Sequence, residues 1–221
     1  MATDSFRLPR IKVSGVRGIE ELPPVLPEAL DAIGFVAWRG SKHNVDVKTA
    51  ARVIAALPEH IAAVVVMVEP YPEEAERFLK ASGARAVQLC GYETVDEWIG
   101  FPYPILRRVA IDEDEESDLE EWTGTARGIV LEHPSAPIGA TERVDAEIAR
   151  RFAERAPCLL AGGLSTENVL TLAHLVRPHG VDASTSLERP NGRKDPAKVA
   201  AFVAAADAAL RAIADLRPIK P

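Results

Sequence analysis

Eight short apolar segments recur along the chain at nearly regular intervals, and this repeat restricts the possible folds more than any other feature. They begin about 24 residues apart on average and cover residues 10–14, 32–37, 61–68, 86–89, 105–111, 128–131, 158–161 and 181–184. A strand, a helix and two short loops occupy about that length in a βα unit. Eight units in 221 residues predict an α/β protein, a (β/α)8 TIM barrel formed as a single domain by residues 1–221, rather than an open doubly wound sheet.

The longest apolar segment is too short to cross a membrane. Ile61–Val68 has eight residues, whereas a membrane-spanning helix needs about 20. Its valine content is typical of a strand buried on both faces. Residues 1–10 are polar and contain Pro9, where an export signal would need an apolar run. We therefore expect a cytoplasmic protein with no membrane partner.

Helical patterns alternate with these segments. Val47–Leu57 has apolar residues at spacings of three and four, which predicts an amphipathic helix. The same holds for residues 72–82, 145–156 and 166–176, and Pro196 lies near the first turn of a last helix. The segment between the first two strands contains Pro23, Pro24 and Pro27. Because an interior proline costs about 3 kcal/mol, only a short or irregular helix is expected there.

Charge and cysteine content argue against several classes of function. The formal net charge is −7, so we expect no nucleic-acid partner, since such binding relies on clustered lysine and arginine. Cys90 and Cys158 form neither a metal-binding pair nor a disulfide framework. We interpret the acidic run Asp112–Glu116 as a solvated helix start, and a metal site is the alternative.

Two loops at the predicted carboxyl ends of the last strands are suited to phosphate. In a parallel barrel, phosphate often binds the loops after strands seven and eight. Gly162 and Gly163 follow the seventh strand and allow backbone N–H groups to approach a ligand. Ser184 and Thr185 end the eighth strand and can donate hydroxyl groups. The alternative is that the glycines only turn the chain, while hydroxyl residues such as Ser165 only cap helices.

Several segments resemble the phosphoribosylanthranilate isomerase family of the tryptophan pathway, over nearly the whole chain. Ile11–Val16 is similar to the family's K-[IV]-C-G-[IL] strand, and Val87–Glu93 to its Q-L-H-G-x-E segment. The resemblance continues in residues 33–36, 160–169, 180–188 and 192–198. It implies an Amadori rearrangement of a phosphorylated small-molecule substrate, an N-(5-phosphoribosyl) aryl amine, without metal or organic cofactor.

The resemblance also implies the catalytic positions, where the chain departs from the family pattern. The family's base is a cysteine ending strand one, here Ser14, and its acid is an aspartate ending strand six, here Glu132. A serine hydroxyl is a far weaker acid than a thiol. The longer side chain of Glu132 displaces its carboxyl group, and errors of roughly 1 Å can cost about 100-fold in rate.

The substrate-binding positions implied by the resemblance are His43, Gln88 and Gly139. His43 stands near the family's arginine for the anthranilate carboxylate, and a neutral histidine offers no bidentate charged contact. Gln88 lies in the Q-L-H-G segment, whose histidine is Cys90 here. Gly139 belongs to the loop after strand six, which has lost several of the family's glycines.

Two hypotheses follow. In the first, the protein is an isomerase in which Glu132 is the acid and either Ser14 or Glu132 moves the second proton, with His43 as a possible substitute base. In the second, it is a divergent paralogue that keeps the sugar-phosphate pocket but catalyses another reaction or only binds a ligand. Purely structural roles are the alternative for both residues: a backbone hydrogen bond for the Ser14 hydroxyl and an arginine partner for Glu132. The sequence indicates neither the amine portion nor the oligomeric state.

Overall fold

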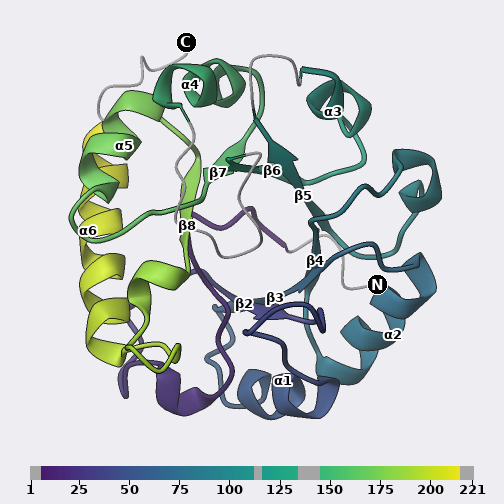
Figure 1. Ribbon diagram of the computed structural model, residues 1–221, viewed down its shortest axis with the longest axis horizontal. Helices are drawn as coiled ribbons and strands as arrows, with labels where there is room; N and C mark the ends of the chain where they lie inside the picture. The colour runs from purple at the N-terminus through teal and green to yellow at the C-terminus, as the bar shows by residue number, and fades with distance from the viewer. Residues whose placement is uncertain (1–5, 112–115, 134–144, 215–221) are drawn as a thin grey trace.

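The computed structural model describes residues 6–111, 116–133 and 145–214. Eight parallel strands close into a barrel in chain order, as the sequence predicts (Figure 1). They are β1 (Ile11–Ser14), β2 (Ala32–Val36), β3 (Ala62–Met67), β4 (Ala86–Leu89), β5 (Ile105–Ala110), β6 (Gly128–Glu132), β7 (Cys158–Leu160) and β8 (Gly180–Ala183). Each begins or ends within one or two residues of its predicted bounds.

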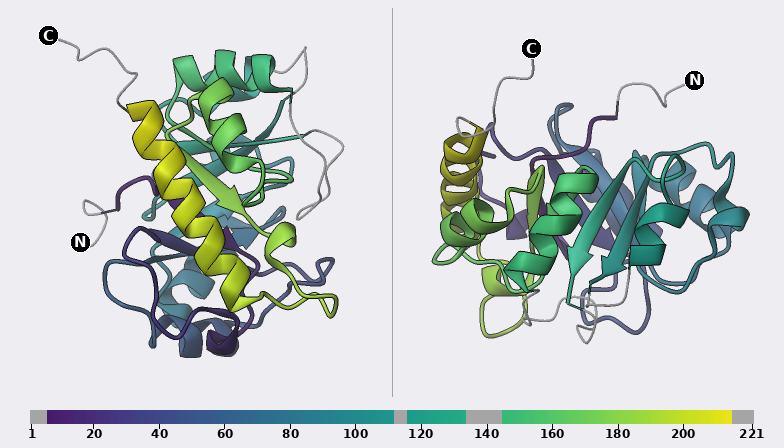
Figure 2. Two further views of the ribbon diagram at one scale, coloured as in Figure 1. Left: turned by 90° about the vertical axis from the view of Figure 1, so that its left-hand side faces the viewer. Right: turned by 90° about the horizontal axis from the view of Figure 1, so that it is seen from above.

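Helices surround the barrel. They are α1 (Val47–Ile54), α2 (Pro72–Ser82), α3 (Glu116–Glu121), α4 (Ala146–Arg155), α5 (Val169–Val176) and α6 (Pro196–Ala214), with short 3-10 helices η1 (Ile19–Glu21), η2 (Val95–Trp98) and η3 (Thr185–Leu187). The single turn η1 is the short helix expected in the proline-rich segment. Figure 2 shows the long α6 (yellow) lying against the outside of the barrel beside α5. Among the described helices, none combines the length and hydrophobicity that crossing a membrane requires.

Two predicted helix bounds are wrong. Helix α1 ends at Ile54 rather than Leu57, and α5 begins at Val169 rather than Thr166. Before α5, the Asn168 side chain accepts a hydrogen bond from the Ser165 N–H and donates one to the Gly163 carbonyl. These bonds hold a turn where the helix was expected, because asparagine side chains compete with the helical backbone for partners. Asn168 is the N-cap residue, and Ser165 Oγ accepts a hydrogen bond from the Glu167 N–H at 3.3 Å in the turn before it.

The half of the barrel interior toward the amino ends of the strands is apolar and closed. Phe6 packs there against the inward-facing side chains Ala32, Val64, Ala86, Leu106, Val130, Leu159 and Ala161. The alternate residues of the strands face outward and pack beneath the helices in the main core. Polar side chains in the interior therefore begin above this layer, toward the carboxyl ends of the strands.

Gly180 lies where two parts of the chain come too close for a side chain. A Cβ atom at this position would stand 2.5 Å from the carbonyl oxygens of both Pro9 and Arg10. We expect Gly180→Ala to lower the free energy of unfolding by about 1–3 kcal/mol, because backbone must shift. Gly128→Ala is the matched control: the three atoms nearest its Cβ all belong to the flexible Leu8 side chain, so the expected loss is smaller. Urea denaturation measures both, and equal losses would contradict this account.

Candidate active site

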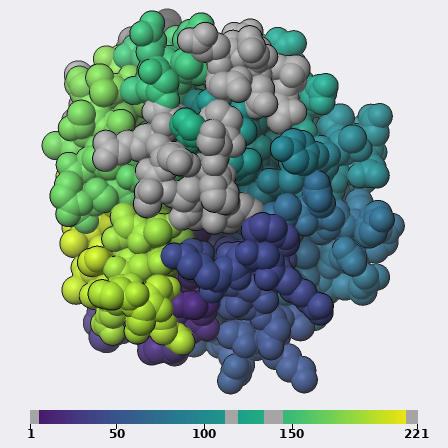
Figure 3. Space-filling model, in the orientation of Figure 1, coloured from purple at the N-terminus to yellow at the C-terminus, as the bar shows by residue number. Residues whose placement is uncertain are grey.

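A hollow opens at the carboxyl ends of the strands. Its cavity volume is about 40 Å³. In Figure 3, the loop around residue 190 (yellow-green) and the loop around residue 40 (dark blue) lie side by side on this face. Of the predicted site residues, eight line the hollow or its rim: Ser14, His43, Gln88, Glu132, Gly162, Gly163, Ser184 and Thr185. Gly139 lies outside the described residues.

A buried ion pair occupies the floor of this hollow. The ammonium group of Lys12 on β1 lies 2.5 Å from a carboxylate oxygen of Asp182 on β8, and Lys12 is fully buried. Lys12 Nζ also donates to Ser14 Oγ at 2.6 Å and to Gln88 Oε1 at 2.8 Å. Its three N–H groups thus all have partners, which a charge removed from water requires.

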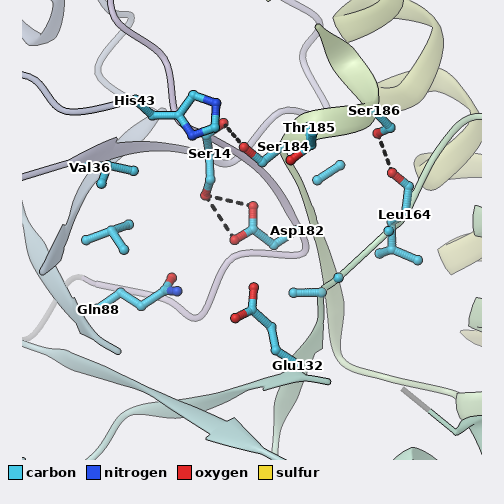
Figure 4. Close-up of a pocket in the computed structure, with 15 residues that line it drawn as sticks. Ser14, Val36, His43, Gln88, Glu132, Leu164, Asp182, Ser184, Thr185 and Ser186 are labelled. Atoms are coloured by element: carbon cyan, nitrogen blue, oxygen red, sulfur yellow. Dashed lines mark hydrogen bonds between the residues drawn. The ribbon is translucent and has the colours of Figure 1, made fainter. Parts of the chain in front are cut away.

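The Ser14 hydroxyl belongs to this network. Ser14 Oγ lies 2.8 Å and 2.9 Å from the two carboxylate oxygens of Asp182, and Figure 4 shows the two side chains facing each other. Because Lys12 can only donate, Ser14 accepts from it and donates its proton to Asp182. The alternative of a backbone partner for this hydroxyl is therefore wrong. The hydroxyl instead adjoins a carboxylate that can accept its proton.

Glu132 enters the hollow from the end of β6. Its carboxylate accepts a hydrogen bond from Arg108 Nε on β5 at 2.5 Å, so the expected arginine partner is present. The Glu132 side chain is only 14% exposed. Burial raises the pKa of Glu132 above its usual value, although the charge of Arg108 acts in the opposite direction. A carboxyl group whose pKa is raised can hold a proton for donation nearer neutral pH.

The loops after β7 and β8 are tied together at the rim of the hollow. The Ser186 hydroxyl donates to the Leu164 carbonyl, and Ser184 Oγ donates to the Ser14 carbonyl at 2.9 Å (Figure 4). Gly162 and Gly163 have φ angles of +80° and +64°, which favour glycine. Within the described chain, their N–H groups donate to no acceptor. The predicted proximity of the two loops is confirmed, and phosphate binding there stays a prediction.

His43 forms part of a charged cluster beside these loops. His43 Nε2 lies 2.6 Å from Glu188 Oε1, and Lys194 Nζ lies 3.0 Å from the same oxygen. Lys42 Nζ contacts the other Glu188 oxygen at 2.9 Å. Burial lowers the pKa of His43, so the ring is neutral at pH 7. With Nε2 bound to Glu188, the other ring nitrogen of the neutral ring carries the free lone pair, so the role of His43 as a substitute base stays a prediction.

Sequence reasoning did not assign roles to Lys12, Asp182, Arg108, Glu188 or Lys194. All but Arg108 stood within the segments that carried the resemblance, and strand alternation places Lys12 on the same face as Ser14. Cys90 contributes no reactive thiolate: burial raises the pKa of its thiol to about 12, and the Gln88 amide donates to its sulfur at 3.4 Å. The described residues contain no group of three or more acidic, histidine or cysteine side chains placed to hold a metal ion.

Comparisons with known proteins agree with this geometry. A family model described as N-(5'-phosphoribosyl)anthranilate (PRA) isomerase matches residues 11–205. The protein of that name from Chromohalobacter salexigens is 32% identical over 206 residues, covering 91% of this chain and 95% of the relative. The one from Pseudomonas putida (strain F1) is 34% identical over 200 residues, covering 89% and 96%. The crystal structure of phosphoribosyl anthranilate isomerase from Thermus thermophilus has a TM-score of 0.76 at 26% identity, covering 94% of this chain and 100% of that chain.

The buried pair makes a testable contribution to stability. We expect Lys12→Met to lower the free energy of unfolding by about 3–5 kcal/mol, because it leaves the Asp182 charge buried without its cation. Adding Asp182→Asn to this variant should recover part of the loss, since the unpaired charge is then removed. A double-mutant cycle measured by urea denaturation gives the coupling between the two residues. Strictly additive effects would show that they do not act as a pair.

Proposed function

Because the chain belongs to the N-(5'-phosphoribosyl)anthranilate isomerase family, we propose that it catalyses the family's reaction. This is the Amadori rearrangement of N-(5'-phosphoribosyl)anthranilate to the corresponding 1-amino-1-deoxyribulose phosphate. One observation carries the proposal: Ser14, Glu132 and the two loops suited to phosphate open into a single hollow at the carboxyl end of the barrel. Acid, base and phosphate anchor are thereby available to one small molecule.

The proposed phosphate anchor is the rim formed by the loops after β7 and β8. Support comes from the N–H groups of Gly162 and Gly163, which have no acceptor within the described chain. Ser184 and Thr185 border the same space, and η3 begins at Thr185. Buried Lys194 lies behind this rim, with its ammonium 3.1 Å from Ser184 Oγ. Backbone amides and a nearby positive charge favour a phosphate dianion.

Glu132 is the proposed general acid. Opening of the ribose ring requires a proton on the ring oxygen as the C1–O bond breaks, which yields a Schiff base. Burial raises the pKa of Glu132 and so favours the protonated form that donates. Arg108 would stabilise the carboxylate that remains after donation, because its guanidinium group is already in contact.

Ser14 and Asp182 are proposed to act together as the base. The Schiff base must lose its C2 proton to form an enamine, which then becomes the ketone. As Ser14 Oγ takes this proton, its own proton can pass to Asp182, whose oxygens lie 2.8 Å and 2.9 Å away. A carboxylate then carries the basicity that a lone serine lacks. Lys12 holds both groups in place through contacts of 2.6 Å and 2.5 Å.

A second candidate function is favoured by His43. This residue is neutral and bound to Glu188, and it offers an anthranilate carboxylate no permanent charge. The alternative is therefore a paralogue that keeps the sugar-phosphate pocket for a ligand with a different amine portion. Such a paralogue either catalyses another reaction on that ligand or only binds it. Lys42, which pairs with Glu188 and is largely exposed, is a cation of the same cluster that could meet a carboxylate at the rim.

Turnover of N-(5'-phosphoribosyl)anthranilate by the purified protein separates these two functions. We expect loss of the substrate with formation of the ribulose phosphate, measured in an assay coupled to the next enzyme. The paralogue predicts no turnover, while phosphate-containing ligands still raise the melting temperature. Gly163→Asp is the control for the anchor, because its added charge and bulk should abolish that rise.

The pH dependence of kcat tests the acid. Glu132 donates only when protonated, so kcat should fall as pH rises through its raised pKa. Arg108→Gln removes the cation that lowers this pKa, so the alkaline limb of the profile should move to higher pH. Glu132→Gln cannot donate, and we expect it to lose about 10²–10⁴-fold in kcat. An unchanged alkaline limb in Glu132→Gln would contradict this role.

Kinetics of single and double variants test the base. Ser14→Ala and Asp182→Asn should each lower kcat by roughly 100-fold or more. The double variant should be no slower than the slower single variant, because the two residues act as one unit. Ser82→Ala is the control, since it removes a buried hydroxyl in α2, away from the hollow. Losses that multiply in the double variant would show that Ser14 and Asp182 act separately.

A further inference from the structure

A second hollow lies at the opposite end of the barrel, where the strands begin. Its cavity volume is about 830 Å³, within the range of sites that bind small molecules. The right-hand view of Figure 2 shows the N-terminal segment (purple) at this end, away from the arrowheads of the strands. Residues 6–10 of that segment form one wall, and residues at or just before the starts of β2, β3, β4, β6 and β8 form the others.

The hollow is basic although the chain is acidic. Four arginines line it, Arg7, Arg10, Arg85 and Arg127, and all four are exposed. Asp31 is the one acidic residue among the lining residues that the structure describes. The lining therefore carries an excess of three positive charges, whereas the whole chain has a formal charge of −7. A concave surface lined by one sign of charge concentrates the opposite ion.

The described residues do not neutralise these positive charges. Within the described chain, the side chains of the four arginines form no ion pair or hydrogen bond. Asp31 is engaged elsewhere, because its Oδ2 accepts from the backbone N–H groups of Arg10 at 2.8 Å and Ile11 at 2.9 Å. Guanidinium groups offer paired N–H donors that match phosphate and carboxylate oxygens.

This hollow is separate from the candidate active site. Packing and hydrogen bonds hold its walls against the barrel. Phe6 is buried against the apolar interior layer, which closes the barrel between the two ends. His179 Nε2 lies 3.0 Å from the Leu8 carbonyl and holds the N-terminal segment over the strand starts. Arg85 and Arg127 are anchored through their backbone N–H groups, which donate to Ala63 and Ile105. Arg85 and Arg127 thus project from residues bonded to the neighbouring strands, and Arg10 directly precedes β1.

We propose that this amino-end hollow binds a small organic anion that carries at least two phosphate or carboxylate groups. Two or more anionic groups are needed to engage arginines that come from different strand starts. The apolar wall formed by Phe6, Leu8 and Pro9 provides contact for the body of such a molecule. This site is independent of the proposed isomerase reaction.

Calorimetric titration with inorganic tripolyphosphate, and separately with citrate, tests the proposal. The titration uses the full chain carrying Gly163→Asp, so that the rim after β7 does not contribute. We expect binding that weakens at least tenfold in the Arg85→Gln/Arg127→Gln variant, since each charged contact contributes about that factor. The matched control is Arg52→Gln/Arg151→Gln, which removes two exposed charges on α1 and α4 and should change the affinity less than twofold.

Each outcome decides for or against the site. Tighter binding of tripolyphosphate than of citrate would identify phosphate as the preferred group, and the reverse order would identify carboxylate. Equal losses in both double variants would show diffuse attraction by surface charge and overturn the proposal. If neither tripolyphosphate nor citrate binds, the proposal is also overturned. If the Arg85→Gln/Arg127→Gln variant does not fold, Arg7→Gln provides the same test from outside the strands.

Discussion

The buried ion pair between Lys12 and Asp182 is the interaction on which the rest of this structure depends. The two residues lie directly opposite each other on β1 and β8, the strands that close the barrel. Closure in this register brings a cation and an anion together inside the barrel, above its apolar layer. A slip of one residue would turn one of them to the other face and leave the other charge unpaired. The register is therefore fixed by charge as well as by packing, and Ser14 and Gln88 are positioned by the same ammonium group.

Two carboxyl groups in one hollow have different surroundings, and the proposed chemistry uses this difference. Burial raises the pKa of Glu132 and favours its protonated form, which suits an acid. Asp182 accepts hydrogen bonds from an ammonium group and a hydroxyl, which suits a proton acceptor held in place. Pairs of carboxyl groups with contrasting environments are a recurrent basis for acid and base assignments. The network also offers a physical reason why serine at position 14 is compatible with proton transfer.

Local sequence patterns predicted the parts of the structure that are determined by residues close together in the chain. The spacing of apolar segments predicted the barrel, and the glycine and hydroxyl residues after β7 and β8 predicted where two loops meet. The partners of Ser14 and His43 were not predicted, because Asp182 and Glu188 lie 168 and 145 residues away along the chain. Such contacts follow from barrel closure and loop packing, which sequence spacing does not specify. The start of α5 was misplaced because Asn168 forms local hydrogen bonds that compete with the helix.

The central claim is that proton transfer at C2 passes through Ser14 to an Asp182 carboxylate held by Lys12. The primary kinetic isotope effect on kcat, measured with substrate deuterated at C2, tests it most directly. The account predicts that replacing Asp182 by asparagine slows turnover and enlarges this isotope effect, because C2 proton removal then limits the rate. An isotope effect and a rate that stay the same in that variant would contradict the claim.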